Sequence, residues 1–376
     1  MEPDDIKDHE SLEAWLEGRS REDAISIAQR SALRATPILF ADMAERWVRE
    51  RDLTALRILR RVLISGVEAV YPTPEVRTAS AAFVFVVVAY ADASVDASAG
   101  VVAAIAAAAD ASAATVAAAA ADRYANAGSY IWEQVREDAR AMTRSTDPLT
   151  LPLWSIPQPD WFKRADAQGR TIWAAEPATW SFWTRWWDGV LSGKQINWDL
   201  QRAIALIPDE DWQKGPAHIA AIIARVEEQF DLRAQIAELK TNLRVVEAQM
   251  VSQTATEALR SHNHPPELVD ANVAIRREVA VVIAALDESE TELAKTVPDP
   301  SILRRVGLAI LSAAKAIANY CIGLADTALK KAAEELGTTG TKWAIRTTTA
   351  YYAAQSEPIH IVGKAIFDFA TKWFSS

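Results

Sequence analysis

Glycine is scarce in this chain, and its scarcity restricts the chain to helical folds. Only 13 of the 376 residues are glycine, and the 16 prolines gather at a few breakpoints. The long tracts between these breakpoints are rich in Ala, Leu, Arg and Glu, which are the residues with the highest helix propensity. The sequence therefore predicts an all-α fold, a multi-helix bundle with a Trp-rich cap, a coiled-coil-like connector and a C-terminal helical bundle.

Breaks in the helical pattern divide the chain into four expected parts. An Ala-rich helical bundle occupies residues 1–150, and a Trp-rich module occupies residues 151–215. A coiled-coil-like connector helix follows at residues 216–260, and a C-terminal amphipathic helical domain fills residues 267–376. The clearest break is the stretch SHNHPPELVD before the last part, because two adjacent prolines force an extended connection.

The Ala-rich run at residues 79–121 is about half alanine and contains no Lys or Arg. Its beginning, FVFVVVAYA, has the composition of a membrane anchor. Asp92 and Asp96 interrupt it soon afterwards, whereas an uninterrupted span needs roughly 20 apolar residues. We therefore expect a helix hairpin at the centre of a bundle, where small alanines let backbones approach closely.

Tryptophan is concentrated in residues 154–212, which hold nine of the fourteen tryptophans. Trp180, Trp183 and Trp187 share one helical face because they are spaced by three and then four residues. Such a cluster builds either a small aromatic core or a partner surface. We favour the core. On a partner surface, Arg185 would stack on an indole.

Residues 217–259 are expected to form one long amphipathic helix. Its apolar positions alternate by four and three residues, the pattern of a coiled-coil seam. The seam consists of Leu232, Ile236, Leu239, Leu243, Val246 and Met250. Because it is shorter than three heptads, it predicts either a helix pair within one chain, which we favour, or an oligomerisation helix that joins chains.

The C-terminal third combines apolar helices with basic ends. Residues 303–329 contain few charges, and paired basic residues at both ends can meet phosphate headgroups. Residues 358–374 add aromatic side chains among lysines. Both segments suit either the core of a soluble bundle, which we favour, or an anionic membrane. The candidate membrane-interacting residues are Arg304, Arg305, Leu308, Ile317, Lys330, Lys331, Trp373 and Phe374.

The sequence offers little for catalysis or cofactor binding. It contains no Walker loop, no dinucleotide-binding glycine motif and no G-x-S-x-G elbow. The weak metal candidates are His262, His264 and Glu267, since two imidazoles and a carboxylate can bind zinc. The adjacent prolines fit a linker better. We predict no cofactor and no enzymatic activity, with a metal-dependent hydrolase that uses the histidine pair as a remote alternative.

Charge and cysteine content indicate the compartment and the partners. The chain has 40 Lys and Arg against 50 Asp and Glu, so no nucleic-acid partner is expected. The single cysteine, Cys321, excludes an internal disulfide and fits a reducing compartment. The polar, acidic N-terminus lacks the features of a secretory signal. A cytoplasmic protein is expected, with peripheral attachment at the inner face of the membrane as a variant of that prediction.

Several stretches resemble recurring patterns in uncharacterised bacterial helical proteins. They are SLEAWLEGRSREDAISIAQRSALR, the Ala-rich run, the PLW…DWF…W…WW pattern and the HNxPPE-type stretch. The resemblance implies a modular build and supplies no known activity.

Composition and layout together favour a non-enzymatic effector or adaptor. Its N-terminal part would hold a partner protein, its connector helix would bring copies together, and its C-terminal helices would act on a membrane or on another protein. A bacterial defence or toxin-like role would fit that layout by analogy alone. The alternative is a soluble structural scaffold for protein–protein interactions.

Overall fold

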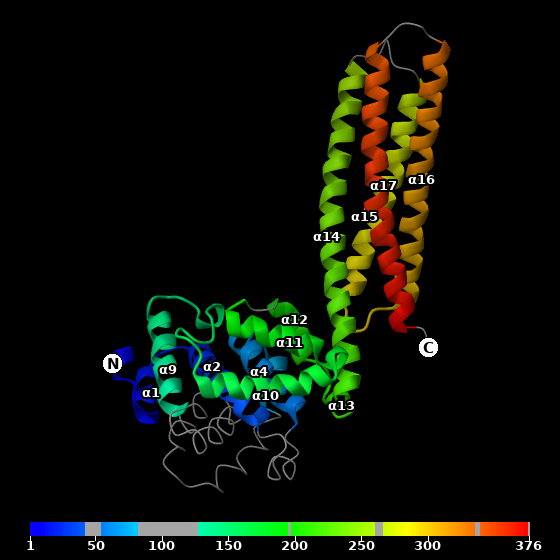
Figure 1. Cartoon of the computed structure of the whole chain (residues 1–376). Helices are drawn as coiled ribbons and strands as arrows, with labels where there is room; N and C mark the ends of the chain where they lie inside the picture. The colour runs from blue at the N-terminus through cyan, green and yellow to red at the C-terminus, as the bar shows by residue number, and fades with distance from the viewer. Residues whose placement is uncertain (42–53, 82–126, 195–196, 260–265, 335–338, 375–376) are drawn as a thin grey trace. The chain divides into compact units, whose positions relative to one another are not determined.

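The computed structural model describes the chain except residues 42–53, 82–126, 195–196, 260–265, 335–338 and 375–376 (Figure 1). Its described residues form thirteen α-helices and no strands. The predicted all-α class is therefore confirmed. The Ala-rich hairpin expected at residues 79–121 lies almost wholly outside the described residues.

The chain divides into two compact units, Met1–Val226 and Glu227–Ser376. Each unit has its own core. The helices that lie wholly in the first unit are α1 (His9–Leu16), α2 (Arg21–Ala41), α4 (Ala55–Val70), α5 (Pro74–Ala81), α9 (Ala127–Thr143), α10 (Asp160–Ala175), α11 (Pro177–Ser192), α12 (Trp198–Ala205) and α13 (Asp209–Trp212). The next helix, α14 (Pro216–Leu259), contains the division between the units.

Side-chain caps and a glycine set several helix ends in the N-terminal unit. Asp8 caps α1, because its Oδ1 accepts a hydrogen bond from the backbone N–H of Ser11 at 3.0 Å, and Thr54 caps α4 in the same way. Helix α11 ends at Gly193, whose φ of 72° favours glycine. A Cβ atom at Gly193 would lie 2.6 Å from the carbonyl carbon of Leu151, so this end of α11 packs directly on the loop before α10.

Helix α2 lies at the centre of the N-terminal unit and packs against α4, α9 and α10. Every residue from 25 to 37 is buried, including charged and hydroxyl side chains. A helix buried on all sides must satisfy its polar groups internally. Ser31 Oγ accordingly donates to the Ile27 carbonyl at 2.8 Å, and the two arginines of this stretch find partners that are described below.

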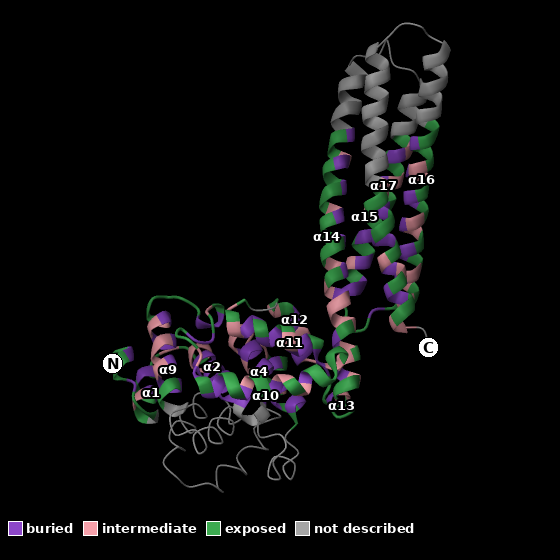
Figure 2. Cartoon of the chain, in the orientation of Figure 1, coloured by how far each residue is buried: buried purple, intermediate pink, exposed green. Residues whose placement is uncertain are grey.

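The C-terminal unit consists of the part of α14 from Glu227 onward together with α15 (Pro266–Leu293), α16 (Pro300–Glu334) and α17 (Thr339–Phe374). These helices lie side by side, with buried residues facing inward and exposed residues outward where side chains are described (Figure 2). All six seam residues, Leu232, Ile236, Leu239, Leu243, Val246 and Met250, belong to this core. The coiled-coil-like seam therefore packs against other helices of its own chain.

Candidate functional site

The tryptophan cluster forms a continuous buried aromatic core. Phe162 of α10 stacks on Trp187 of α11, with ring centroids 6.5 Å apart and an angle of 19° between the rings. Trp183 meets Trp186 edge to face at 5.7 Å. Ring contacts run in sequence through Trp154, Trp161, Phe162, Trp187, Trp186, Trp183 and Trp212. The cluster thus ties α10, α11 and α13 to the loop before α10.

Polar anchors fix the orientation of two indoles in this core. Trp186 Nε1 donates to Gln201 Oε1 at 2.8 Å, and Gln201 is itself buried. Trp187 Nε1 donates to Asp166 Oδ1, also at 2.8 Å. A buried indole N–H needs such a partner because leaving it unsatisfied would cost a hydrogen bond. The core is therefore specified by hydrogen bonds as well as by shape.

The tryptophans considered for a partner surface are core residues. Trp180, Trp183 and Trp187 are 6%, 1% and 0% exposed. An indole shielded from solvent offers no contact area to a partner. Arg185 of the same helix is the only one of these four residues that is exposed. In this conformation the face of α11 that carries the three indoles serves the fold.

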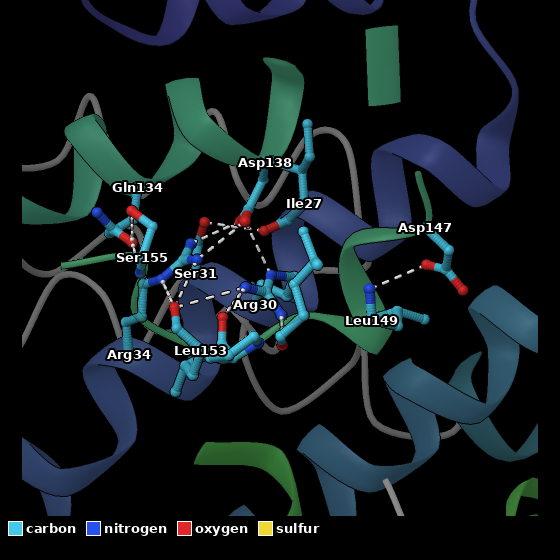
Figure 3. A network of polar contacts seen from close by, with 12 residues as sticks. Ile27, Arg30, Ser31, Arg34, Gln134, Asp138, Asp147, Leu149, Leu153 and Ser155 are labelled. Atoms are coloured by element: carbon cyan, nitrogen blue, oxygen red, sulfur yellow. Dashed lines mark hydrogen bonds and ion pairs between the residues drawn. The ribbon is translucent and has the colours of Figure 1, made fainter. Parts of the chain in front are cut away.

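Two arginines of α2 enclose one aspartate of α9, and we call these three residues the arginine clamp (Figure 3). Asp138 Oδ1 accepts a hydrogen bond from Arg30 Nε at 2.9 Å, and its Oδ2 accepts one from Arg34 Nη1 at 2.7 Å. The arginines also donate to backbone carbonyls of the loop before α10. Arg30 Nη2 lies 2.8 Å from the Pro152 oxygen, and Arg34 Nη2 lies 2.8 Å from the Leu153 oxygen. The clamp therefore ties α2, α9 and this loop together.

The arginine clamp is buried and combines two positive charges with one negative charge. Burial lowers the pKa of Arg30 to about 10. The positive charge of Arg34 also lowers this pKa, whereas the carboxylate of Asp138 raises it. A guanidinium with this pKa is still charged at neutral pH. Asp138 accepts three N–H groups and is 2% exposed, so it is not available as a general base. The chemistry of this cluster is that of a structural tie.

The arginine clamp was not predicted from the sequence. Its one local indication is that Arg30 and Arg34 share a face of a helix whose neighbouring positions are mostly apolar. Asp138 is 104 residues from Arg34, and no spacing rule connects them.

Large apolar side chains are exposed on the outer side of α15 and α16. Arg305 Nη2 of α16 donates to Glu288 Oε1 of α15 at 2.5 Å, and this contact shows the register of the antiparallel pair. Tyr320 and Val273 each lie fifteen residues from that contact, so they lie at the same level of the pair. The exposed apolar residues are Val273, Val281, Leu308, Tyr320 and Ile322, with exposed fractions of 62%, 43%, 54%, 40% and 62%. We call this set the α15–α16 face.

Basic side chains accompany the α15–α16 face. Arg276, Arg277 and Lys315 are exposed on the same two helices, and residues 300–323 contain no Asp or Glu. Among the described residues, one helical segment is long and apolar enough to cross a membrane, the 24 residues Pro300–Gly323 of α16. Only 39% of the apolar 18-residue stretch within this segment is buried in the protein. The face therefore exposes apolar and basic side chains, and α15 also exposes the carboxylates of Asp287 and Glu288.

The structure separates the membrane candidates into core and surface residues. Leu308 and Arg305 are exposed, whereas Ile317 is 1% exposed and belongs to the core. Arg304, Trp373 and Phe374 are half-buried. The side chains of Lys330 and Lys331 lie outside the described part of the chain. Tyr320 and Ile322 were missed, although they continue the apolar pattern of the same helix.

The weak metal candidates fall outside what the structure describes. His262 and His264 belong to the undescribed residues 260–265, and the side chain of Glu267 is likewise not described. Elsewhere in the described chain, no group of three or more His, Cys, Asp or Glu residues is placed to hold a metal ion.

Comparison with known proteins gives no relative from which an activity could be transferred. No protein family, no curated protein and no solved structure matches this chain.

Proposed function

We propose that this chain is a non-enzymatic helical effector whose C-terminal unit binds anionic membranes through the α15–α16 face. The N-terminal unit, with its aromatic core and arginine clamp, would act as a rigid module that holds a protein partner. The observation that carries the proposal is the α15–α16 face, which combines exposed apolar side chains with basic neighbours. Transfer of apolar side chains into the acyl boundary lowers the free energy, and so does the approach of lysines and arginines to anionic headgroups.

Charge distribution along the chain supports a lipid partner. The whole chain has a net charge of -10. Residues 300–374 nevertheless contain nine Lys and Arg against five Asp and Glu. A local excess of positive charge in the most apolar helices favours an anionic surface over a neutral one. The attraction should weaken as salt rises, because exposed charges are screened.

The first prediction concerns vesicle binding by a charge-introduced variant. Leu308→Glu combined with Ile322→Glu should lower affinity for vesicles that contain phosphatidylglycerol by roughly 100-fold, because burying two such side chains contributes about 3 kcal/mol. Vesicle cosedimentation and release of an entrapped dye measure the effect. Phosphatidylcholine vesicles should bind the unmodified protein weakly.

A control for this experiment is available on α14. Val245 is 53% exposed and lies outside the α15–α16 face, so Val245→Glu makes the same kind of change elsewhere in the C-terminal unit. This variant should bind vesicles nearly as well as the unmodified protein. If the unmodified protein ignores anionic vesicles, or if the two variants bind equally, membrane action through this face is wrong and the soluble scaffold becomes the better hypothesis.

A further inference from the structure

We infer that α16 and α17 enter the bilayer together, as a helical hairpin that separates from α14 and α15. The inference rests on the proposed membrane function and goes further, because it names the element that inserts and the interface that opens. Three observations support it: the glycine packing between α16 and α17, the contacts that hold the other two helices, and the distribution of charge between the two helix pairs.

Helices α16 and α17 approach each other through glycine. A Cβ atom at Gly307 would lie 3.0 Å from the Cβ of Phe367 and 3.1 Å from the Gly363 carbonyl oxygen. A Cβ atom at Gly363 would lie 2.7 Å from Ile310 Cγ2. Close backbone packing of this kind depends on shape and dispersion rather than on exclusion of water, so it also holds helices together in lipid. The α16–α17 interface can therefore survive transfer into a bilayer.

Helices α14 and α15 are held to this hairpin by interactions that depend on water. Part of the contact is the shared apolar core, whose driving force disappears when lipid replaces water. The rest includes polar contacts near the surface. Glu228 of α14 accepts hydrogen bonds from Lys372 Nζ at 2.6 Å and from Trp373 Nε1 at 2.7 Å, and Arg305 pairs with Glu288. Exposed ion pairs of this kind contribute little to stability.

The two pairs of helices also differ in net charge. Residues 227–299, which include α15 and most of α14, contain 14 Asp and Glu against seven Lys and Arg. Residues 300–374, which include α16 and α17, have nine basic and five acidic residues. An anionic bilayer therefore attracts α16 and α17 more strongly than α14 and α15. The α15–α16 face makes the first contact, and opening between α15 and α16 then exposes the apolar side of the hairpin to the acyl chains.

Two chemical crosslinks at the same level of the bundle test this inference. Both are built in a Cys321→Ala background, which removes the native thiol. The pair Glu288→Cys and Arg305→Cys ties α15 to α16 where these side chains now meet. The pair Arg304→Cys and Thr371→Cys ties α16 to α17, since Arg304 Nη2 reaches the Ala370 oxygen at 3.3 Å. A short bismaleimide joins the two cysteines of each pair, and we call the crosslinked proteins the α15–α16 lock and the α16–α17 lock. The same variants capped with N-ethylmaleimide serve as controls.

Release of dye from phosphatidylglycerol vesicles distinguishes the outcomes. The α15–α16 lock should lower the release at least tenfold relative to its capped control, while the α16–α17 lock should change it by less than about twofold. The inference is overturned if the α16–α17 lock blocks release, because the two helices would then have to part. It is also overturned if the α15–α16 lock has no effect. If the unmodified protein fails to bind these vesicles at all, the proposed function itself is wrong.

Discussion

Asp138→Asn should destabilise the N-terminal unit by about 3–5 kcal/mol, a large fraction of the stability of an ordinary domain. The substitution keeps the size of the side chain and removes its charge. Arg30 and Arg34 would then face each other as two buried cations without a counter-ion, and both are at most 3% exposed. The loop before α10 would lose its tie as well, because the same guanidinium groups hold its carbonyl oxygens.

The electrostatic origin of this loss can be separated from a loss of packing. Arg30→Met removes one of the two cations and leaves Arg34 paired with Asp138, so it should cost less than Asp138→Asn. Asp160→Asn makes the same chemical change at an exposed position of α10 and should stay within about 1 kcal/mol of the unmodified protein.

Urea unfolding followed by tryptophan fluorescence measures these effects, because 12 of the 14 tryptophans lie in the N-terminal unit. An Arg30→Met variant less stable than Asp138→Asn would contradict the proposed charge imbalance.

Local periodicity predicted the parts of this structure that are repeated along one helix. The six seam positions, from Leu232 to Met250, alternate by four and three, and all of them are buried. The spacing of Trp180, Trp183 and Trp187 likewise put three indoles on one face of α11. In both cases the spacing identified which residues share a face and left open whether that face meets its own chain or a partner. That choice depends on helices far away in the sequence.

Contacts between distant segments carry no local pattern, and these were missed. Asp138 lies in α9, beyond the Ala-rich run, and only the fold brings it to Arg34. Gly307 and Gly363 look like ordinary helix-weakening glycines in sequence. Their importance comes from the neighbouring backbone, which is set by how α16 and α17 pack. The sequence also did not predict which side of α16 is exposed, because an apolar helix has the same composition whether one side or every side is buried.

Gly363→Leu should destabilise the C-terminal unit by about 3 kcal/mol, because the new side chain would begin inside the space of a neighbouring helix. The Cβ atom alone would lie 2.7 Å from Ile310 Cγ2 and 3.3 Å from the Leu311 backbone nitrogen. Backbone cannot be displaced as cheaply as the end of a flexible side chain. The improved helix propensity of leucine, about 1 kcal/mol over glycine, offsets only part of this cost.

Gly323→Leu provides the matched control, since a Cβ atom at Gly323 would meet nothing within 4 Å. Without a clash, the gain in helix propensity should leave this variant as stable as the unmodified protein or up to about 1 kcal/mol more stable.

The thiol of Cys321 measures the stability of the unit that contains both glycines. This side chain is 3% exposed, so a thiol reagent reacts with it only after the core opens. Labelling should be on the order of 100-fold faster in Gly363→Leu than in the unmodified protein, as 3 kcal/mol implies. If both leucine variants are labelled at the unmodified rate, backbone contact at Gly363 does not hold α16 to α17, and the idea that these helices move as a pair loses its physical basis.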